Sequence, residues 1–285
     1  MGVRRLSALL RWLFKGTKTP EPSGVEVVHF AGADLTLDLA WKHERQYFRY
    51  LQEGLSAPQI EVDALVLRRC LSEGARVLDL GANIGFTALQ SLEAGASTVL
   101  AVEAQPDLFE RLRSLGSAKI NVLNKAIGAE AGTAQLFVSE THNQGSTIDP
   151  STVDRFARIF GRKPASVEVE ATTIDHLKGH PFDFWKLDIE GAELAALSGA
   201  TLSLTDHPPR HIYAEIYSAD QLAQIRALLG NSHPFQYRVL LEGSGPFQLV
   251  LDPTVLHPDT RPRRFARHSP SYLFAREEMI LSPTA

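Results

Sequence analysis

Short apolar runs alternate with stretches of helical periodicity from Gly74 onward, and this alternation is typical of a parallel sheet with helical connections. Several runs are continuously apolar, as strands covered on both faces should be. The predicted strands are ARVLDL, STVLAVE, KINVLNKAIG, DFWKLDI, HIYAEIY, QYRVLLE and FQLVLD, with two further β-like pieces, TAQLFVS and SVEVEATTI, after the third. The pattern predicts a doubly wound α/β fold with a mostly parallel sheet.

The residues before Gly74 follow a different pattern. Two β-like runs, VEVVHF and DLTLDLA, flank a turn at residues 31–33 and predict a hairpin, and residues 41–56 and 61–73 are predicted helices. Residues 1–15, MGVRRLSALLRWLFK, have leucines at helical spacing and basic residues on other faces. We expect an amphipathic helix that packs on the domain, with contact to an anionic membrane surface as the alternative.

Composition and charge exclude several classes of function. The formal net charge of -4 argues against nucleic acid, whose phosphates call for clustered Lys and Arg. The single cysteine, Cys70, excludes an internal disulfide and any multi-cysteine metal site. No apolar run approaches the roughly 18 residues of a membrane span, and Arg11 and Lys15 interrupt any signal-peptide pattern. We therefore expect a cytoplasmic protein.

A buried strand, a turn with two glycines and a helix follow one another in ARVLDLGANIGFTALQSLEAG. Gly81 and Gly85 let a ligand approach the backbone without interference from a Cβ, and the helix that we expect to begin near Ile84 offers free N–H groups. A nucleoside or an amino-acid carboxylate fits such a turn. A tight strand-to-helix connection without a ligand is the alternative for a glycine pair alone.

Asp79, two residues before Gly81, separates two classes of cofactor. A dinucleotide site requires GxGxxG, and an acidic residue beside it would repel the pyrophosphate. The pattern here is DxGxxxG, with Asn83 inside it. S-adenosylmethionine has no phosphate and carries an ammonium and a sulfonium, which a carboxylate attracts. We predict an S-adenosylmethionine site that includes Asp79, Gly81, Asn83 and Gly85.

Glu103 follows the next predicted strand in STVLAVEAQP, and Pro106 opens a helix behind it. An acidic residue about 20 residues after a glycine turn can accept both hydroxyls of a ribose. We therefore predict that Glu103 binds the cofactor's ribose. The alternative is a helix-start charge favoured by the macrodipole.

Three acidic residues follow the predicted strand in DFWKLDIEGAE. Ligands of open α/β sheets bind at the carboxyl ends of strands, and Asp188 and Glu190 share one face if the strand continues through Ile189. The two carboxylates could hold a sulfonium, and one could accept a proton from a substrate hydroxyl, so both are predicted catalytic residues. A role at the helix N-terminus is the alternative, and we favour it for Glu193.

Two further residues are candidates for the same pocket. Glu215 ends the predicted strand HIYAEIY and either faces the pocket or pairs with a basic neighbour. His142, in the polar loop SETHNQGSTID, is a candidate general base, although a lone histidine in such a loop is more often only solvated. The ten histidines show no HxxxH or related spacing, so we predict no metal site.

The segments VLDLGANIG, EAQP, NKAIG and FDFWKLDIEGAELAALSGA resemble the FkbM family of methyltransferases, over about residues 25 to 275. The resemblance is greatest in KLDIEGAE at 186–193. It implies a class I, Rossmann-like methyltransferase fold, S-adenosylmethionine as cofactor, and methylation of a hydroxyl oxygen on a small metabolite, sugar or glycolipid. The loop around His142 resembles the family's glycine-serine-rich loop near the cofactor. Ala104 departs from the Pro that members often have after the ribose-binding Glu.

Together these patterns predict two parts of the chain. Residues 1–73 would form an N-terminal helix, a hairpin and cap helices, and residues 74–285 would form an S-adenosylmethionine-binding catalytic domain. Two other functions remain open, namely a noncatalytic cofactor-binding or scaffold protein and a nicotinamide-dependent oxidoreductase. The missing GxGxxG counts against the oxidoreductase. A nitrogen acceptor would place similar demands on the cofactor half.

Overall fold

The computed structural model describes most of the chain. The described residues are 23–139, 142–161, 164–179, 181–254, 257–259, 261 and 263–279. The predicted amphipathic helix at residues 1–15 lies outside these ranges, as does most of the linker after it. Within the described ranges, every helix is too short or too polar to span a bilayer.

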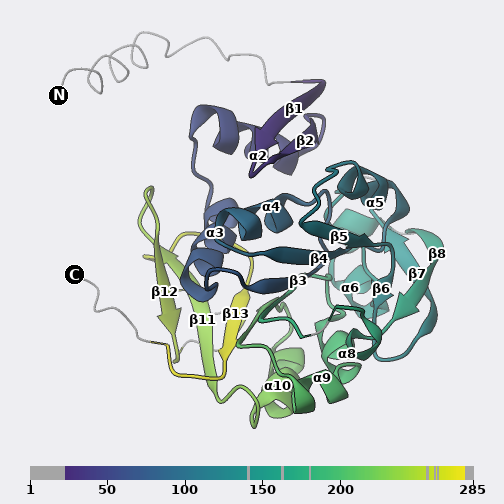
Figure 1. Ribbon diagram of the computed structural model, residues 1–285, viewed down its shortest axis with the longest axis vertical. Coiled ribbons are helices and arrows are strands. Elements are labelled where there is room, and N and C mark those ends of the chain that lie inside the picture. Colours follow the sequence, from purple (N-terminus) through teal and green to yellow (C-terminus); the bar gives the residue numbers. More distant parts are fainter. Residues whose placement is uncertain are drawn as a thin grey trace.

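An eight-stranded sheet forms the centre of the molecule (Figure 1). Its strands are β3 (Arg76–Leu80), β4 (Thr98–Val102), β5 (Ile120–Leu123), β9 (Phe184–Leu187), β10 (His211–Glu215), β11 (Phe235–Glu242), β12 (Gln248–Asp252) and β13 (Ser271–Ala275). In the order β12-β11-β13-β10-β9-β3-β4-β5, the five strands from β10 to β5 are parallel. β13 is antiparallel to both neighbours, and β12 is antiparallel to β11. The predicted mostly parallel sheet is confirmed.

The order of the strands reverses between β3 and β9. The chain continues from β3 to β4 and β5 on one side, and from β9 to β10 on the other. Open α/β sheets bind ligands in the crevice outside the carboxyl ends of strands at such a switch point. The segments after Leu80 and Leu187 are therefore the part of the fold where a ligand is expected.

Helices cover both faces of this sheet (Figure 1). The helices are α2 (Lys42–Glu53), α3 (Pro58–Cys70), α4 (Phe86–Glu93), α5 (Pro106–Arg113), α6 (Pro150–Arg155), α7 (Ala157–Phe160), the 3-10 helix η1 (Ile174–His176), α8 (Glu193–Ser198), α9 (Thr201–Asp206) and α10 (Ala219–Leu229). Val77 and Phe184 pack with α3, α4 and α5, whereas Leu78 and Trp185 pack with α8 and α10. The strand runs are continuously apolar because side chains on both faces are buried.

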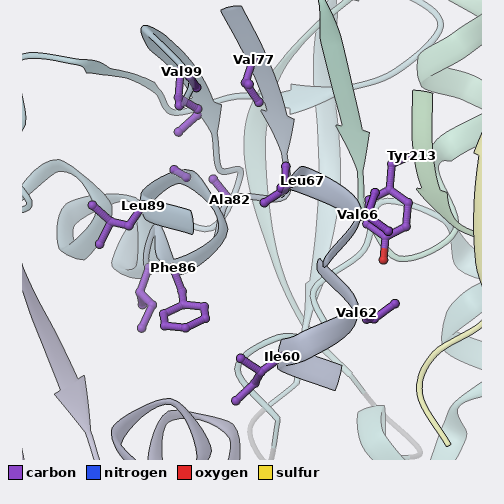
Figure 2. Packing of buried hydrophobic residues seen from close by; sticks show 14 of the residues in the cluster. Ile60, Val62, Val66, Leu67, Val77, Ala82, Phe86, Leu89, Val99 and Tyr213 are labelled. Atoms are coloured by element: carbon purple, nitrogen blue, oxygen red, sulfur yellow. The ribbon is translucent and has the colours of Figure 1, made fainter. Parts of the chain in front are cut away.

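The cluster around α3 and α4 joins the N-terminal part of the chain to the sheet. Figure 2 shows side chains of α3 and α4, including Leu67 and Phe86, in one cluster with Val77, Val99 and Tyr213 of the strands. Cys70 ends α3 and packs against this cluster, and burial raises the pKa of its thiol to about 12. A buried, protonated thiol is typical of a structural cysteine.

Two smaller sheets flank the central one. The predicted hairpin is present as β1 (Val25–Phe30) and β2 (Ala33–Asp38). The β-like pieces after the third predicted strand are β7 (Gly132–Val138) and β8 (Ala165–Thr172), which pair antiparallel, while β6 (Ala126–Ile127) pairs with β8. The prediction of one strand for KINVLNKAIG was wrong, because that segment divides into β5 and β6 in different sheets.

Candidate functional site

The turn after β3 lies directly against the segment after β9. Gly81 has a φ of 79°, and a Cβ at this position would overlap the carbonyl oxygen of Asp188 and lie 2.8 Å from its carbonyl carbon. Gly85 has a φ of 90°, and a Cβ there would lie 2.8 Å from Cδ1 of Leu112. The helix begins at Phe86, two residues later than expected. Gly81 is therefore required by the close approach of the segment after β9, whereas Gly85 is required mainly by its positive φ, because ends of flexible leucine side chains can move.

Glu103 and Asn83 are joined at the edge of this turn. The backbone N–H of Asn83, which has a φ of 52°, donates to Oε2 of Glu103 at 2.8 Å, and the N–H of Gln105 donates to Oε1 at 2.8 Å. Burial raises the pKa of Glu103 to about 7, although these N–H groups oppose the shift. The two hydrogen bonds fix the carboxylate while each oxygen keeps a lone pair for another donor.

A cavity lies beside Glu103. Its apolar walls are Val102, Ala104, Leu108, Ala126, Ile127, Leu136 and Ile148. Its polar lining consists of Asn83, Glu103, Lys125, Asn143, Gln144, Ser146, Thr147, Asp188 and Glu190. Apolar walls that accept a purine, beside a carboxylate that can accept ribose hydroxyls, fit the adenosine part of S-adenosylmethionine. We call this the smaller cavity.

Asp79 lies behind the cavities rather than in their walls. Its side chain is fully buried, and Lys186 Nζ is 3.6 Å from Asp79 Oδ1 and 3.0 Å from Asp188 Oδ2. Burial raises the pKa of Asp79. For Lys186, burial lowers the pKa, but Asp188 and Asp79 outweigh this effect and raise it. Asp79 is therefore coupled to the site through Lys186, and its direct contact with a cofactor stays a prediction.

Asp188 and Glu190 lie in the walls of the site, but not for the expected reason. β9 ends at Leu187, and Glu190 has a φ of 53°, so the alternation of a continuing strand does not apply. The backbone carbonyl of Glu190 accepts a hydrogen bond of 2.6 Å from Oγ1 of Thr147. The turn, rather than the strand, brings the two carboxyl groups into the same cavities.

Glu193 stabilises this turn. Its Oε1 accepts hydrogen bonds from the N–H groups of Ile189 at 3.1 Å and Gly191 at 3.2 Å, and Oε2 accepts one from Gln221 at 3.2 Å. The side chain begins α8 and is 1% exposed. These contacts give Glu193 the structural role that the sequence favoured for it.

A second cavity, the larger cavity, adjoins the first. Side chains of α2, α3, α4, α7 and the ends of β9 and β10 line it, and its carboxyl groups are those of Asp63, Asp188, Glu190 and Glu215. The two cavities share a wall, and the residues that line both are Gly81, Asn83, Gln144, Asp188 and Glu190. The two cavities are therefore neighbours along these residues.

Burial and mutual repulsion raise the pKa values of two carboxyl groups in the larger cavity. The pKa of Glu190 is raised well above its ordinary value by burial and then by Glu215 and Asp188. The pKa of Glu215 is raised to about 8 by burial and then by Asp188, while the hydroxyl of Tyr217 donates to its Oε1. Glu215 thus faces the pocket, which is the first of its two predicted alternatives.

His142 also lines the larger cavity. Burial and then Lys42 lower the pKa of its imidazole, which is therefore neutral at pH 7. His43 lies close by, with ring centroids 6.0 Å apart, and burial lowers its pKa to about 3. In the described part of the chain, no group of three or more His, Cys, Asp or Glu side chains is arranged to hold a metal ion.

Sequence reasoning missed a buried polar network that reaches the smaller cavity from α2. Glu44 is fully buried and accepts hydrogen bonds from both Nη atoms of Arg111, at 2.9 and 2.6 Å, and from Nδ2 of Asn143 at 2.8 Å. These residues are 67 and 99 positions from Glu44. No local pattern marks Glu44, because its helix also carries the charged residues Lys42, Arg45, Arg49 and Glu53.

Several solved structures are similar to this chain. They include a methyltransferase FkbM from Methylobacillus flagellatus KT, with 16% identity and a TM-score of 0.47 over 81% of this chain and 51% of that one. A SAM-dependent methyltransferase from Agrobacterium tumefaciens has 12% identity and a TM-score of 0.44 over 93% and 75% of the two chains. A precorrin-6y C5,15-methyltransferase from Geobacter metallireducens GS-15 has 10% identity and a TM-score of 0.39 over 77% and 90%.

The family of this chain is shown by its sequence rather than by the similar structures. The chain spans about half the length of the Methylobacillus protein, and a comparison with the curated proteins finds no match. The methyltransferase FkbM domain matches residues 79–239, which is more than half of the chain and includes both segments that form the shared wall, after β3 and after β9. The chain therefore belongs to the FkbM methyltransferase family, whose cofactor is S-adenosylmethionine.

Proposed function

We propose that this protein transfers a methyl group from S-adenosylmethionine to a hydroxyl oxygen of a small metabolite, sugar or glycolipid. The observation that carries the proposal is the wall shared by the two cavities, at which Asp188 and Glu190 line both. In the proposal the smaller cavity binds the cofactor and the larger one binds the acceptor. The geometry then allows contact between the two ligands only where the methyl group must pass.

On the cofactor side, the chain's own residues hold and orient the ligand. Glu103 accepts a hydrogen bond from the ribose, the glycines at 81 and 85 keep the turn in place, and the apolar walls cover the purine. Asp188 provides negative charge at the shared wall, where it favours a sulfonium. The bound cofactor supplies an electrophilic methyl group, so alignment of the acceptor contributes much of the rate.

On the acceptor side, Glu190 is the proposed general base. A hydroxyl must lose its proton as it is methylated, and a carboxyl group with a raised pKa accepts a proton more readily than an ordinary one. The neighbouring carboxyl groups and Gln144 offer hydrogen-bond acceptors to further hydroxyls. These features support a polyhydroxylated acceptor such as a sugar.

The proposal is tested by incubating the protein with methyl-labelled S-adenosylmethionine and a lysate separated into glycans, lipids and small metabolites. We expect label in one fraction with the wild type, and much less with Glu103→Ala or Asp188→Ala. A noncatalytic protein would bind the cofactor and label nothing. Mass spectrometry of the labelled product distinguishes an O-methyl from an N-methyl group.

The raised pKa of Glu103 predicts how binding of S-adenosylhomocysteine depends on pH. We expect the affinity for S-adenosylhomocysteine to increase as the pH rises through about 7, because the ionised carboxylate accepts hydroxyl hydrogen bonds more strongly than the acid. Glu103→Gln should bind about tenfold more weakly at pH 8 and lose this pH dependence. Isothermal titration calorimetry between pH 6 and 8 measures both, and a Gln variant that keeps the wild-type slope would exclude Glu103 as its origin.

A further inference from the structure

Asn143 has a buried side-chain oxygen without a partner. The residue is 5% exposed and lines the smaller cavity, and its Oδ1 makes no hydrogen bond to any part of the chain that the structure describes. Buried polar atoms are nearly always hydrogen-bonded in native proteins, and an unsatisfied one costs about 1–3 kcal/mol. An unsatisfied acceptor in a cavity wall indicates a ligand that donates to it.

The orientation of the Asn143 amide is fixed from the opposite side. Nδ2 donates to Oε1 of Glu44 at 2.8 Å. A carboxylate only accepts hydrogen bonds, so the NH₂ group must face Glu44 and the oxygen must face away from it. Hydrogen-bonding chemistry therefore assigns the positions of Nδ2 and Oδ1 in this side chain.

Glu44 is itself held rigidly. Two hydrogen bonds from Arg111, and a third of 2.6 Å from the backbone N–H of Asp38, fix its carboxylate at the end of β2. Glu44 lines neither cavity. It can affect a ligand only through Asn143 and the surrounding structure.

The backbone of Asn143 lies close to the proposed ribose site. Its carbonyl accepts a hydrogen bond of 3.1 Å from Nδ2 of Asn83, and the N–H of Asn83 binds Glu103. Asn83 thus bridges Asn143 and Glu103. The rest of the wall combines apolar side chains with Lys125, Ser146 and Thr147.

We propose that one ribose hydroxyl of the cofactor donates a hydrogen bond to Oδ1 of Asn143 while the other donates to Glu103, and that Glu44 is the residue that positions the Asn143 amide. The inference rests on the proposed cofactor site. It gives the N-terminal helix α2, which lies outside the matched family domain at 79–239, a part in binding the methyl donor.

The test measures binding to the whole protein by calorimetry, without any acceptor. The ligands are S-adenosylhomocysteine and its 2′-deoxy and 3′-deoxy analogues, and the variants are Asn143→Ala and Glu44→Gln. Asn231→Ala is the matched control, because Asn231 is exposed and lines neither cavity. Thermal unfolding of each variant establishes that it is folded.

We expect Asn143→Ala to bind S-adenosylhomocysteine about tenfold more weakly than the wild type. In this variant, one of the two deoxy analogues should bind as tightly as the parent ligand, because the hydroxyl that it lacks has already lost its partner. Glu44→Gln should reduce the wild-type preference for that same hydroxyl. The Asn231→Ala control should match the wild type with all three ligands.

Two results would overturn the inference alone. They are wild-type affinity in Asn143→Ala, and an equal loss for the parent and both analogues, which indicates a structural effect. If the wild type itself binds no S-adenosylhomocysteine, the proposed cofactor site fails together with this inference.

Discussion

Gly81→Ala is expected to abolish binding of S-adenosylhomocysteine and to lower the free energy of unfolding by about 2–4 kcal/mol. The added Cβ would overlap the backbone carbonyl of Asp188, and neither backbone segment can move without separating the turn after β3 from the turn after β9. These turns carry four of the five residues shared by the two cavities, so the same displacement damages both. Calorimetry and denaturation in guanidinium measure the two effects.

Gly74→Ala is a matched control for this substitution. Gly74 has a φ of 81°, close to the 79° of Gly81, but a Cβ there would have no atom within 4 Å. Gly74→Ala therefore has the conformational cost of an alanine at positive φ, but its Cβ overlaps no other atom. We expect it to cost about 1 kcal/mol and to leave ligand binding unchanged. Equal destabilisation by the two substitutions would show that the contact with Asp188 is unimportant.

Glu190→Gln is expected to lower the rate of methyl transfer by about 10²- to 10⁴-fold, because the amide cannot accept the proton of the acceptor hydroxyl. Binding of S-adenosylhomocysteine, which has no sulfonium charge, should change little. The loss would then appear in kcat, measured once the labelling experiment has identified an acceptor. Transfer at the wild-type rate would exclude Glu190 as the base.

The pH dependence gives an independent check on Glu190. Because its pKa is raised, the group is protonated and inactive at low pH, and activity should rise as the pH increases through a value above the ordinary range of a carboxyl group. In Glu215→Gln a neighbouring carboxyl group that raises this pKa is removed, so the rise should move to lower pH while transfer continues. It should still lie above the ordinary range, since burial is the largest cause of the shift. If activity rises at the same pH in Glu215→Gln as in the wild type, Glu215 does not affect the pKa of the base.

Much of the fold was predicted from local patterns, because strands buried on both faces are continuously apolar and are separated by helical segments. The division of KINVLNKAIG was not, since it depends on a distant contact. Nδ2 of Asn124 donates to the carbonyls of Glu103 at 2.8 Å and Ala104 at 3.1 Å, just where the chain leaves the central sheet. The place of β13 between β10 and β11 likewise depends on pairing that no local pattern encodes.

The candidate site was also predicted only in part. The spacing of Gly81, Asn83 and Glu103 predicted their proximity, since the ends of neighbouring parallel strands meet at one edge of the sheet. The ion pair between Asp79 and Lys186 depends on the register of β3 and β9, in which these two residues are direct partners. The division of the chain after residue 73 stays a prediction, although one core cluster includes side chains from both parts.

The link from Glu44 to Asn143 constrains how proteins of this kind can diversify. α2 and α3 line the larger cavity, so recombination of residues 23–70 between relatives would be a simple route to a new acceptor. The same exchange would replace Glu44 and release the Asn143 amide. A transplanted segment therefore has to bring its own carboxylate at this position, or the hybrid would gain a substrate while losing affinity for the methyl donor.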